Sequence, residues 1–242
     1  MESFLDRSKD ADLDQLVREL AAHRRGNRRR SLHLQAWRFT IASAYVTKRL
    51  MDIAFSATGL VLLLPLFLVV ALAIRIDSPG PVFFHQIRVG RYGRHFKFWK
   101  FRSMRADAEA RKAALAARNE SADGVIFKMR RDPRITRVGR VIRRTSIDEL
   151  PQLWNVLIGD MSLVGPRPPT PDEVRQYTHE DRKRLDVIPG ITGLWQVMGR
   201  SEIPFREQVR LDKEYILAHG IWKDVKILLR TIPAIIGGKG AY

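Results

Sequence analysis

Residues 53–74 read IAFSATGLVLLLPLFLVVALAI, an apolar stretch with no charged side chain between Asp52 and Arg75. A helix needs about 20 mostly apolar residues to cross a bilayer, so this stretch is long enough to span one. Pro65 lies near its middle. Because proline removes a backbone donor and clashes with the preceding turn, its position predicts a kink.

Lys and Arg are abundant on both sides of this stretch. The flanking basic residues are Arg24, Arg25, Arg28, Arg29, Arg30, Lys48 and Arg49 before it, and Arg75, Arg88, Arg91, Arg94, Lys97 and Lys100 after it. Short loops rich in Lys and Arg stay on the cytoplasmic side of a membrane. The pattern therefore favours a re-entrant, broken helix over residues 46–76 that enters from one face and returns to it. A plain transmembrane helix with a tolerated proline is the alternative.

The composition narrows the choice of partners. The chain has 242 residues and a net charge of +17, a balance typical of proteins that meet nucleic acid, anionic lipid or phosphorylated substrates. The apolar stretch favours the last two, because basic residues beside an anionic leaflet gain about 1 kcal/mol each. Cysteine is absent from the sequence, which excludes disulfides and Cys-based metal sites. No signal peptide is evident, so we expect the rest of the chain to face the cytoplasm.

The remaining pattern predicts an α+β protein that is mostly helical. Residues 1–45 suggest an amphipathic and basic arm, in which AHRRGNRRR is either a solvated linker or a lipid-headgroup contact. Residues 77–242 suggest a cytoplasmic catalytic domain. Its expected elements are a small β-hairpin from 81–90 and 95–104, helices at 105–117 and 135–145, an amphipathic helix at 205–220 and an interfacial helix at 221–238.

Asp148 and Glu149 form an acidic pair just after a run of arginines. One interpretation is structural: Ser146 followed by Glu149 has the spacing of a capping box, and acids are favoured in a first helical turn. Pro151 weakens this interpretation, because a helix would then begin only at the proline. The other interpretation is catalytic, since a carboxylate near arginines stays ionised and can act as a nucleophile or bind a hard cation.

Two stiff loops follow the acidic pair. Residues 165–169, GPRPP, hold Arg167 in a fixed place, and a guanidinium suits bidentate phosphate binding. The structural alternative is a proline-rich turn with a solvated arginine. Residues 189–193, PGITG, form either a tight turn or a backbone surface for phosphate or base. The six histidines show no metal-ligand spacing, and P-loop, GxSxG and dinucleotide fingerprints are absent from the sequence.

Five segments in this order resemble one family. They are KRLMD at 48–52, the proline-broken apolar stretch, FWKFRSM at 98–104, RRTSIDELPQLWNVLIGDMSLVGPRP at 143–168 and PGITGLWQV at 189–197. The chain resembles the bacterial sugar transferases, the monotopic polyprenyl-phosphate phosphoglycosyl transferases, over residues 45–237. Only about 45 residues precede the shared unit, so it looks like a compact form.

The resemblance implies a reaction and a site. Asp148 would attack the sugar-bearing phosphate of a UDP-sugar, release UMP and pass the phosphosugar to undecaprenyl phosphate, while Glu149 would hold Mg²⁺. A hexose-1-phosphate is the expected cargo, by analogy with short relatives that start exopolysaccharides. The substrate and phosphate contacts that we expect are Arg143, Arg167, Lys48, Arg49, Gln196 and Arg200. Asp52 and Pro65 would be structural at the membrane break, where Leu64 replaces the serine of some relatives.

These expectations place the protein at the cytoplasmic face of a bacterial inner membrane, with membrane lipids as partners. Nucleic acid is not expected as a partner, and self-association is left open. The alternative from another class is a non-catalytic basic module, anchored to the membrane, that binds nucleic acid or anionic lipid. It explains the charge but not an acidic pair set among arginines and followed by GPRP.

Overall fold

A computed structural model describes residues 43–111, 114, 115, 120, 129, 132–199, 202–218 and 220–236. The chain from Arg49 onwards forms one compact unit, and the residues up to Lys48 form another. The described part is mostly helical with two small two-stranded sheets, which confirms the expected mostly helical α+β class. The amphipathic arm at 1–42 lies outside the described residues, and the expected domain limits at 45 and 76 stay predictions.

The apolar stretch forms two helices with a bend between them. The helix Ser43–Leu62 and α2 (Leu64–Asp77) are inclined by 59° to each other, which confirms the predicted kink. Pro65 lies in the first turn of α2, where its missing N–H leaves no helical hydrogen bond unmade. Among the described residues, neither helix alone is long and apolar enough to cross a membrane, whereas the bent pair passes by length and composition.

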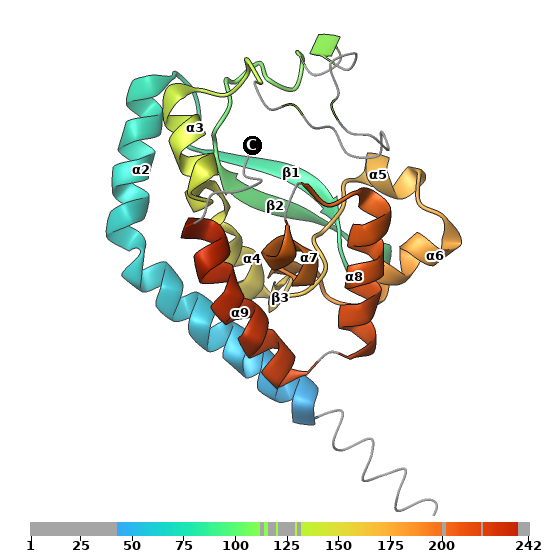
Figure 1. Ribbon diagram of the computed structural model, residues 1–242. Helices are drawn as coiled ribbons and strands as arrows, with labels where there is room; N and C mark the ends of the chain where they lie inside the picture. Colours follow the sequence, from blue (N-terminus) through green and yellow to red (C-terminus); the bar gives the residue numbers. More distant parts are fainter. Residues whose placement is uncertain are drawn as a thin grey trace, which may run out of the picture. The chain divides into compact units, whose positions relative to one another are not determined.

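The predicted β-hairpin is confirmed. Strands β1 (Phe83–Val89) and β2 (His95–Phe101) pair antiparallel, with Phe83 opposite Phe101 and Val89 opposite His95. A 3₁₀ turn, η1 (Arg91–Gly93), connects the two strands, which lie at the centre of Figure 1. Alternation buries Phe96 and Phe98 on one face of β2, as expected for a strand that covers a core.

The segment after the hairpin only partly follows the prediction. Residues 106–111 form turns and residues 114 and 115 are 3₁₀-helical, so the helix predicted at 105–117 is wrong for these residues; residues 112, 113, 116 and 117 lie outside the described part. The basic helix is confirmed as α3 (Arg137–Arg144), whose first turn is capped by Thr136 accepting from the amide of Gly139. Helix α3 packs against α2 in a core cluster of Val70, Ile74, Phe101 and Ile142.

A second sheet joins two loops that are far apart in the sequence. Strand β3 (Ser162–Val164) pairs parallel with β4 (Gly190–Thr192). The strands are so close that a Cβ atom on Gly190 would lie 2.0 Å from the amide nitrogen of Gly165. The pairing therefore requires glycine there, and it brings the GPRPP and PGITG loops together.

The C-terminal helices complete the unit. They are α4 (Gln152–Ile158), α5 (Pro171–Arg175), α6 (His179–Arg182), the 3₁₀ helix η4 (Lys183–Asp186), α7 (Leu194–Met198), α8 (Phe205–Leu217) and α9 (Ile221–Ile236). The last two confirm the helices predicted at 205–220 and 221–238, the latter over its described residues. A core cluster of Val164, Leu194, Trp195, Leu211, Tyr215 and Ile227 packs α7, α8 and α9 on β3 (Figure 1).

Candidate active site

The acidic pair lies on a short 3₁₀ turn, η3 (Ile147–Glu149), between α3 and α4. Ser146 precedes it in the left-handed conformation, with φ 57°, and its side chain makes no cap. Helix α4 begins at Gln152, after Pro151. The capping-box interpretation is therefore wrong, because the backbone at Ser146 and the ring of Pro151 separate the pair from the helix. Neither carboxylate takes part in a capping box, so both can make other contacts.

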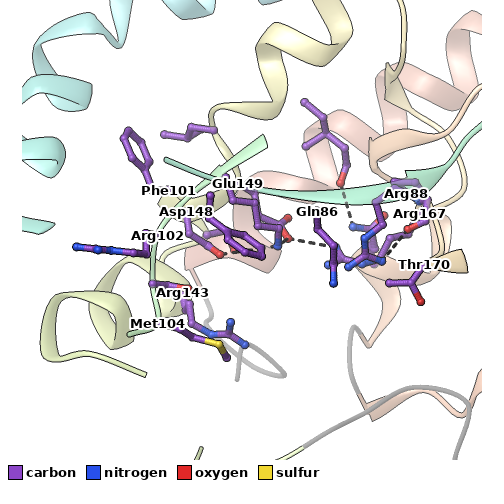
Figure 2. A pocket seen from close by; sticks show the side chains of 18 of the residues that line it. Gln86, Arg88, Phe101, Arg102, Met104, Arg143, Asp148, Glu149, Arg167 and Thr170 are labelled. Atoms are coloured by element: carbon purple, nitrogen blue, oxygen red, sulfur yellow. Dashed lines mark hydrogen bonds and ion pairs between the residues drawn. The ribbon is translucent and has the colours of Figure 1, made fainter. Parts of the chain in front are cut away.

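Glu149 is held by two cations from distant parts of the chain. Its Oε1 accepts a hydrogen bond from Lys100 Nζ at 2.7 Å and another from Arg167 Nη1 at 3.2 Å. Asp148 is a weaker partner of the same lysine, with 3.8 Å between Oδ2 and Nζ. Lys100 comes from β2 and Arg167 from the loop after β3, so hairpin, 3₁₀ turn and loop meet here (Figure 2).

The surroundings shift the pKa values of Asp148 and Glu149 in opposite directions. Burial alone would raise the pKa of Glu149, but Lys100 and Arg167 outweigh it, and that pKa lies well below its ordinary value. Burial raises the pKa of Asp148, and Lys100 only partly opposes this, while the charge of Glu149 adds to it. Burial also lowers the pKa of Lys100, against the two carboxylates. Asp148 is thus the less stabilised anion, as expected of a nucleophile rather than of a structural ion.

A cavity of about 850 Å³ opens in front of the pair. Its volume lies in the range of sites for ligands of nucleotide size. Basic residues that line the cavity include Arg88, Lys100, Arg143 and Arg167, and Figure 2 shows these three arginines on either side of Asp148 and Glu149. In the part of the chain that the structure describes, Nε of Arg88 and Nε of Arg143 are buried without a hydrogen-bond partner. Guanidinium groups at a cavity wall suit an anionic ligand.

Arg88 was not among the expected site residues. Its Nη1 donates to the carbonyl of Pro168 at 3.0 Å, and its guanidinium lies 5.2 Å from the centre of the Phe98 ring. Burial lowers its pKa to about 10, so it stays protonated at neutral pH. It is a second guanidinium beside Arg167.

Lys100 was also missed, although the sequence contains a signal for it. It alternates with Phe96 and Phe98 on the face of β2 that is buried. A lysine on a buried face needs a carboxylate partner. From the alternation one could therefore have predicted that Lys100 contacts an acidic residue such as Asp148 or Glu149.

The structure brings most, but not all, of the expected site residues together. Asp148, Glu149, Arg143, Arg167 and Gln196 all line the one cavity. Lys48 precedes the compact unit that contains the cavity, and Arg200 lies outside the described residues. Their roles stay predictions.

Arg49 and Asp52 make contacts other than those expected. Arg49 donates from Nη1 and Nη2 to the carbonyls of Val156 and Leu157, at 2.6 and 2.8 Å, at the C-terminal end of α4. Asp52 is buried, and its Oδ1 accepts from the amide of Leu163 in β3 at 3.0 Å. These bonds tie the helix Ser43–Leu62 to the two elements that follow Glu149 and precede Arg167, rather than to phosphate or to the bend.

Asp148 and Glu149 are the carboxylates at this site that could bind a divalent cation. No group of three or more His, Asp or Glu side chains gathers as a metal site within the described ranges. Mg²⁺, however, is usually bound by one or two carboxylates together with waters and substrate phosphates. Both bonds to Glu149 use Oε1, which leaves Oε2 for a metal. A site of this kind, completed by a phosphorylated ligand, fits Asp148 and Glu149.

The cavity thus places two carboxylates among four cations, an arrangement that suits a phosphate-bearing ligand. An apolar bent helix pair precedes these residues in the chain. The chain belongs to the bacterial sugar transferase family, whose sequence profile matches residues 43–238.

Curated relatives agree with this assignment. The galactosyl transferase CpsE of Streptococcus agalactiae is 51% identical over 202 residues, which cover 82% of this chain and 44% of the relative. The UDP-glucose:undecaprenyl-phosphate glucose-1-phosphate transferase of Caulobacter vibrioides is 40% identical, over 81% of this chain and 72% of the relative. The exopolysaccharide production protein ExoY of Sinorhizobium fredii is 36% identical, over 81% and 88%.

The chain spans less than half the length of several curated relatives that it matches. The names of the relatives are those of sugar transferases and exopolysaccharide production proteins, so the alternative of a non-catalytic binding module is not supported.

Proposed function

We propose that the protein is a phosphoglycosyl transferase. It moves a hexose-1-phosphate from a UDP-hexose to undecaprenyl phosphate, releases UMP and so initiates assembly of an exopolysaccharide or O-antigen-type glycan. Relatives named for transfer of sugar phosphate to undecaprenyl phosphate support the donor and acceptor classes. The observation that carries the proposal is the buried Asp148 beside Glu149, which Lys100 and Arg167 hold in place.

The reaction consists of two displacements at one phosphorus atom. A carboxylate oxygen of Asp148 attacks the sugar-bearing phosphorus, the bond from that phosphorus to the bridging oxygen breaks, and UMP leaves with the electron pair. A phosphate oxygen of undecaprenyl phosphate then attacks the aspartyl-phosphosugar, and the acyl-phosphate bond breaks to restore Asp148. Arg88, Arg143 and Arg167 bind the phosphate oxygens and stabilise charge that develops on them.

Glu149 positions this chemistry. Its pKa lies far below neutrality, so it is an anion throughout and keeps Lys100 close to Asp148. Glu149, together with Asp148, would hold Mg²⁺, which supplies charge neutralisation at the diphosphate. Removal of divalent cations with a chelator is therefore expected to stop turnover while the fold persists.

The bent helix pair is the proposed membrane element. Its apolar side chains are exposed on the described unit; they include Phe55, Val61, Leu62, Leu64, Leu68, Val69, Leu72 and Ile76. Helix α9 adds Trp222, Leu229 and Ile232, which are also exposed. Exposed apolar area of this extent marks a membrane or protein contact. We place the pair as a re-entrant helix in the cytoplasmic leaflet of the inner membrane, with α9 at the interface and lipids as neighbours.

The first experiment measures UMP release from a panel of UDP-sugars. Purified protein in nanodiscs receives undecaprenyl phosphate and Mg²⁺, and wild type is compared with Asp148→Asn. Loss of a nucleophile costs at least about a thousandfold in turnover. The matched control is Glu207→Gln, which removes an exposed carboxylate and is expected to leave the rate unchanged. UMP release that survives in Asp148→Asn contradicts the mechanism, and no release with any UDP-sugar contradicts the function.

A further inference from the structure

Strand β1 presents alternate side chains to the cavity of the acidic pair. Phe84, Gln86 and Arg88 all line it, and every second residue of a strand lies on the same face. The antiparallel register places Lys100 opposite Phe84 and Phe98 opposite Gln86, so these residues of β2 belong to the same face of the hairpin. The mechanism proposed above uses Arg88 and Lys100 from this face but not Gln86.

Gln86 lies between two cations that meet the loops of the site. On one side of it, Lys100 Nζ donates to Glu149 Oε1 at 2.7 Å. On the other side, Arg88 Nη1 donates to the carbonyl of Pro168 at 3.0 Å. Figure 2 accordingly shows Gln86 between Glu149 and Arg88. A phosphorus atom that lies between the carboxylates and the guanidinium groups is therefore beside Gln86.

The Gln86 amide is available to a ligand. The side chain is half-buried and, among the described residues, makes no hydrogen bond within the chain. On the same face, Phe96 and Phe98 are 8% and 1% exposed, and the other side chains named above are apolar or cationic. Ligand cavities are mostly apolar with a few polar groups that fix the orientation of the ligand. An uncharged polar side chain on this inward face therefore indicates a ligand contact rather than a solvated surface position.

We propose that the Gln86 amide binds the phosphosugar that the enzyme transfers, as a further substrate-binding residue. This inference rests on the proposed function and deepens it. Arg88, Arg143 and Arg167 supply charge to the phosphate oxygens, whereas the amide supplies direction. Its N–H groups donate to a phosphate oxygen or to a sugar hydroxyl, and its carbonyl oxygen accepts from a hydroxyl. The phosphosugar takes part in both displacements, so the contact is available in both.

The test is a binding measurement by calorimetry on the full chain in nanodiscs, with UMP, UDP, UDP-glucose and UDP-galactose. All proteins carry Asp148→Asn, which keeps the UDP-hexoses intact, and Gln86→Leu is added to it. Leucine keeps the approximate volume of glutamine and removes both the donor and the acceptor. The matched control is His85→Leu, a change to leucine at the neighbouring exposed position on the opposite face of β1.

The ligands separate the two parts of the phosphosugar. UMP lacks the transferred phosphate, UDP has that phosphate without a sugar, and a UDP-hexose has both. If Gln86 bonds the phosphate, Gln86→Leu weakens the binding of UDP and of the UDP-hexoses by roughly tenfold and leaves that of UMP unchanged. If Gln86 bonds a hydroxyl of the sugar, only the UDP-hexoses bind more weakly. Either result supports the inference.

Unchanged affinity of Gln86→Leu for the UDP-hexoses overturns the inference. An equal loss for UMP also overturns it, because the contact would then lie at the nucleoside or in the fold. The same loss in His85→Leu has the same meaning, since His85 does not line the cavity. In each of these cases UMP release by the wild type would leave the proposed function intact. An Asp148→Asn protein that binds neither UDP nor a UDP-hexose contradicts the proposed function itself.

Discussion

Two clusters of ionised side chains contain the same kinds of groups but differ in how these are paired. In one, Lys100 contacts both Asp148 and Glu149, and Arg167 contacts Glu149, at the cavity wall. In the other, Arg184 meets Asp212 at 2.6 Å, and both side chains are at most 4% exposed. Arg184 also donates to the hydroxyl of Tyr177 at 3.0 Å.

The two clusters differ in how cations and anions are paired and in how exposed the side chains are. The Arg184–Asp212 pair is one cation to one anion, and it joins η4 to α8. In the cluster of the acidic pair, two adjacent carboxylates compete for the same lysine, so that their pKa values move in opposite directions. The one-to-one pair joins two elements of the fold, whereas an unevenly shared cluster that faces a cavity keeps one anion available for reaction.

The largest effect on stability is expected for Asp212→Asn. This change leaves the charge of Arg184 buried without its counter-ion, which costs about 3–5 kcal/mol. Chemical denaturation in detergent measures the loss, with Asp148→Asn as the control that should keep near wild-type stability. Equal losses in both variants would remove the distinction between the two clusters.

The pH dependence of the free energy of unfolding is a second test of the Arg184–Asp212 pair. Burial raises the pKa of Asp212 to about 6, above its ordinary value of 3.8, so the folded state holds this proton more tightly than the unfolded state. The free energy of unfolding therefore falls as pH rises through about 4 to 6, and the contribution is lost above 6. Asp212→Asn is expected to lack this part of the slope; an unchanged slope would assign it to other groups.

Lys100→Met is expected to have the opposite profile: a large effect on turnover and a small one on stability. The lysine opposes the rise in the pKa of Asp148, so its removal raises that pKa further. Activity then begins to fall at a higher pH as the medium is acidified, and kcat/KM below neutrality drops by about ten- to a hundredfold. The measurement is kcat/KM against pH.

The matched control is Lys97→Met, an exposed lysine on the same strand, which should leave the profile unchanged. An acidic limb that moves to lower pH in Lys100→Met would mean that the lysine does not stabilise the Asp148 anion.

The smallest effect is expected at an exposed ion pair. Arg210 and Glu207 lie 2.6 Å apart, but their side chains are 61% and 44% exposed. Exposed pairs contribute little, because water screens them and ordering the side chains costs entropy. Arg210→Gln should change neither the melting temperature nor the rate of UMP release. A measurable loss of either would show that the contribution of these ion pairs depends on distance alone and not on burial.

Sequence patterns predicted the elements that are determined by residues close together in the chain. The alternation at 81–90 and 95–104 indicated the hairpin, and Pro65 indicated the bend. Family resemblance, rather than spacing, decided between the structural and the catalytic interpretation of Asp148 and Glu149. Local pattern does not report pairings across long separations, such as Lys100 with Glu149 or β3 with β4. The resemblance, for its part, implied a substrate contact for Arg49, whose guanidinium binds backbone carbonyls of α4 in the structure.

The anchoring of the helix Ser43–Leu62 has a consequence for synthesis on the ribosome. Arg49 and Asp52 find their partners 107 to 111 residues further along the chain. At about 5–20 residues per second, those partners emerge roughly 5–20 seconds after the helix does. During that interval a buried aspartate and an arginine of the apolar element are without their native bonds. The segment from α4 to β3 thus completes the element that is translated before it, and a chain truncated before β3 would leave that element unfinished.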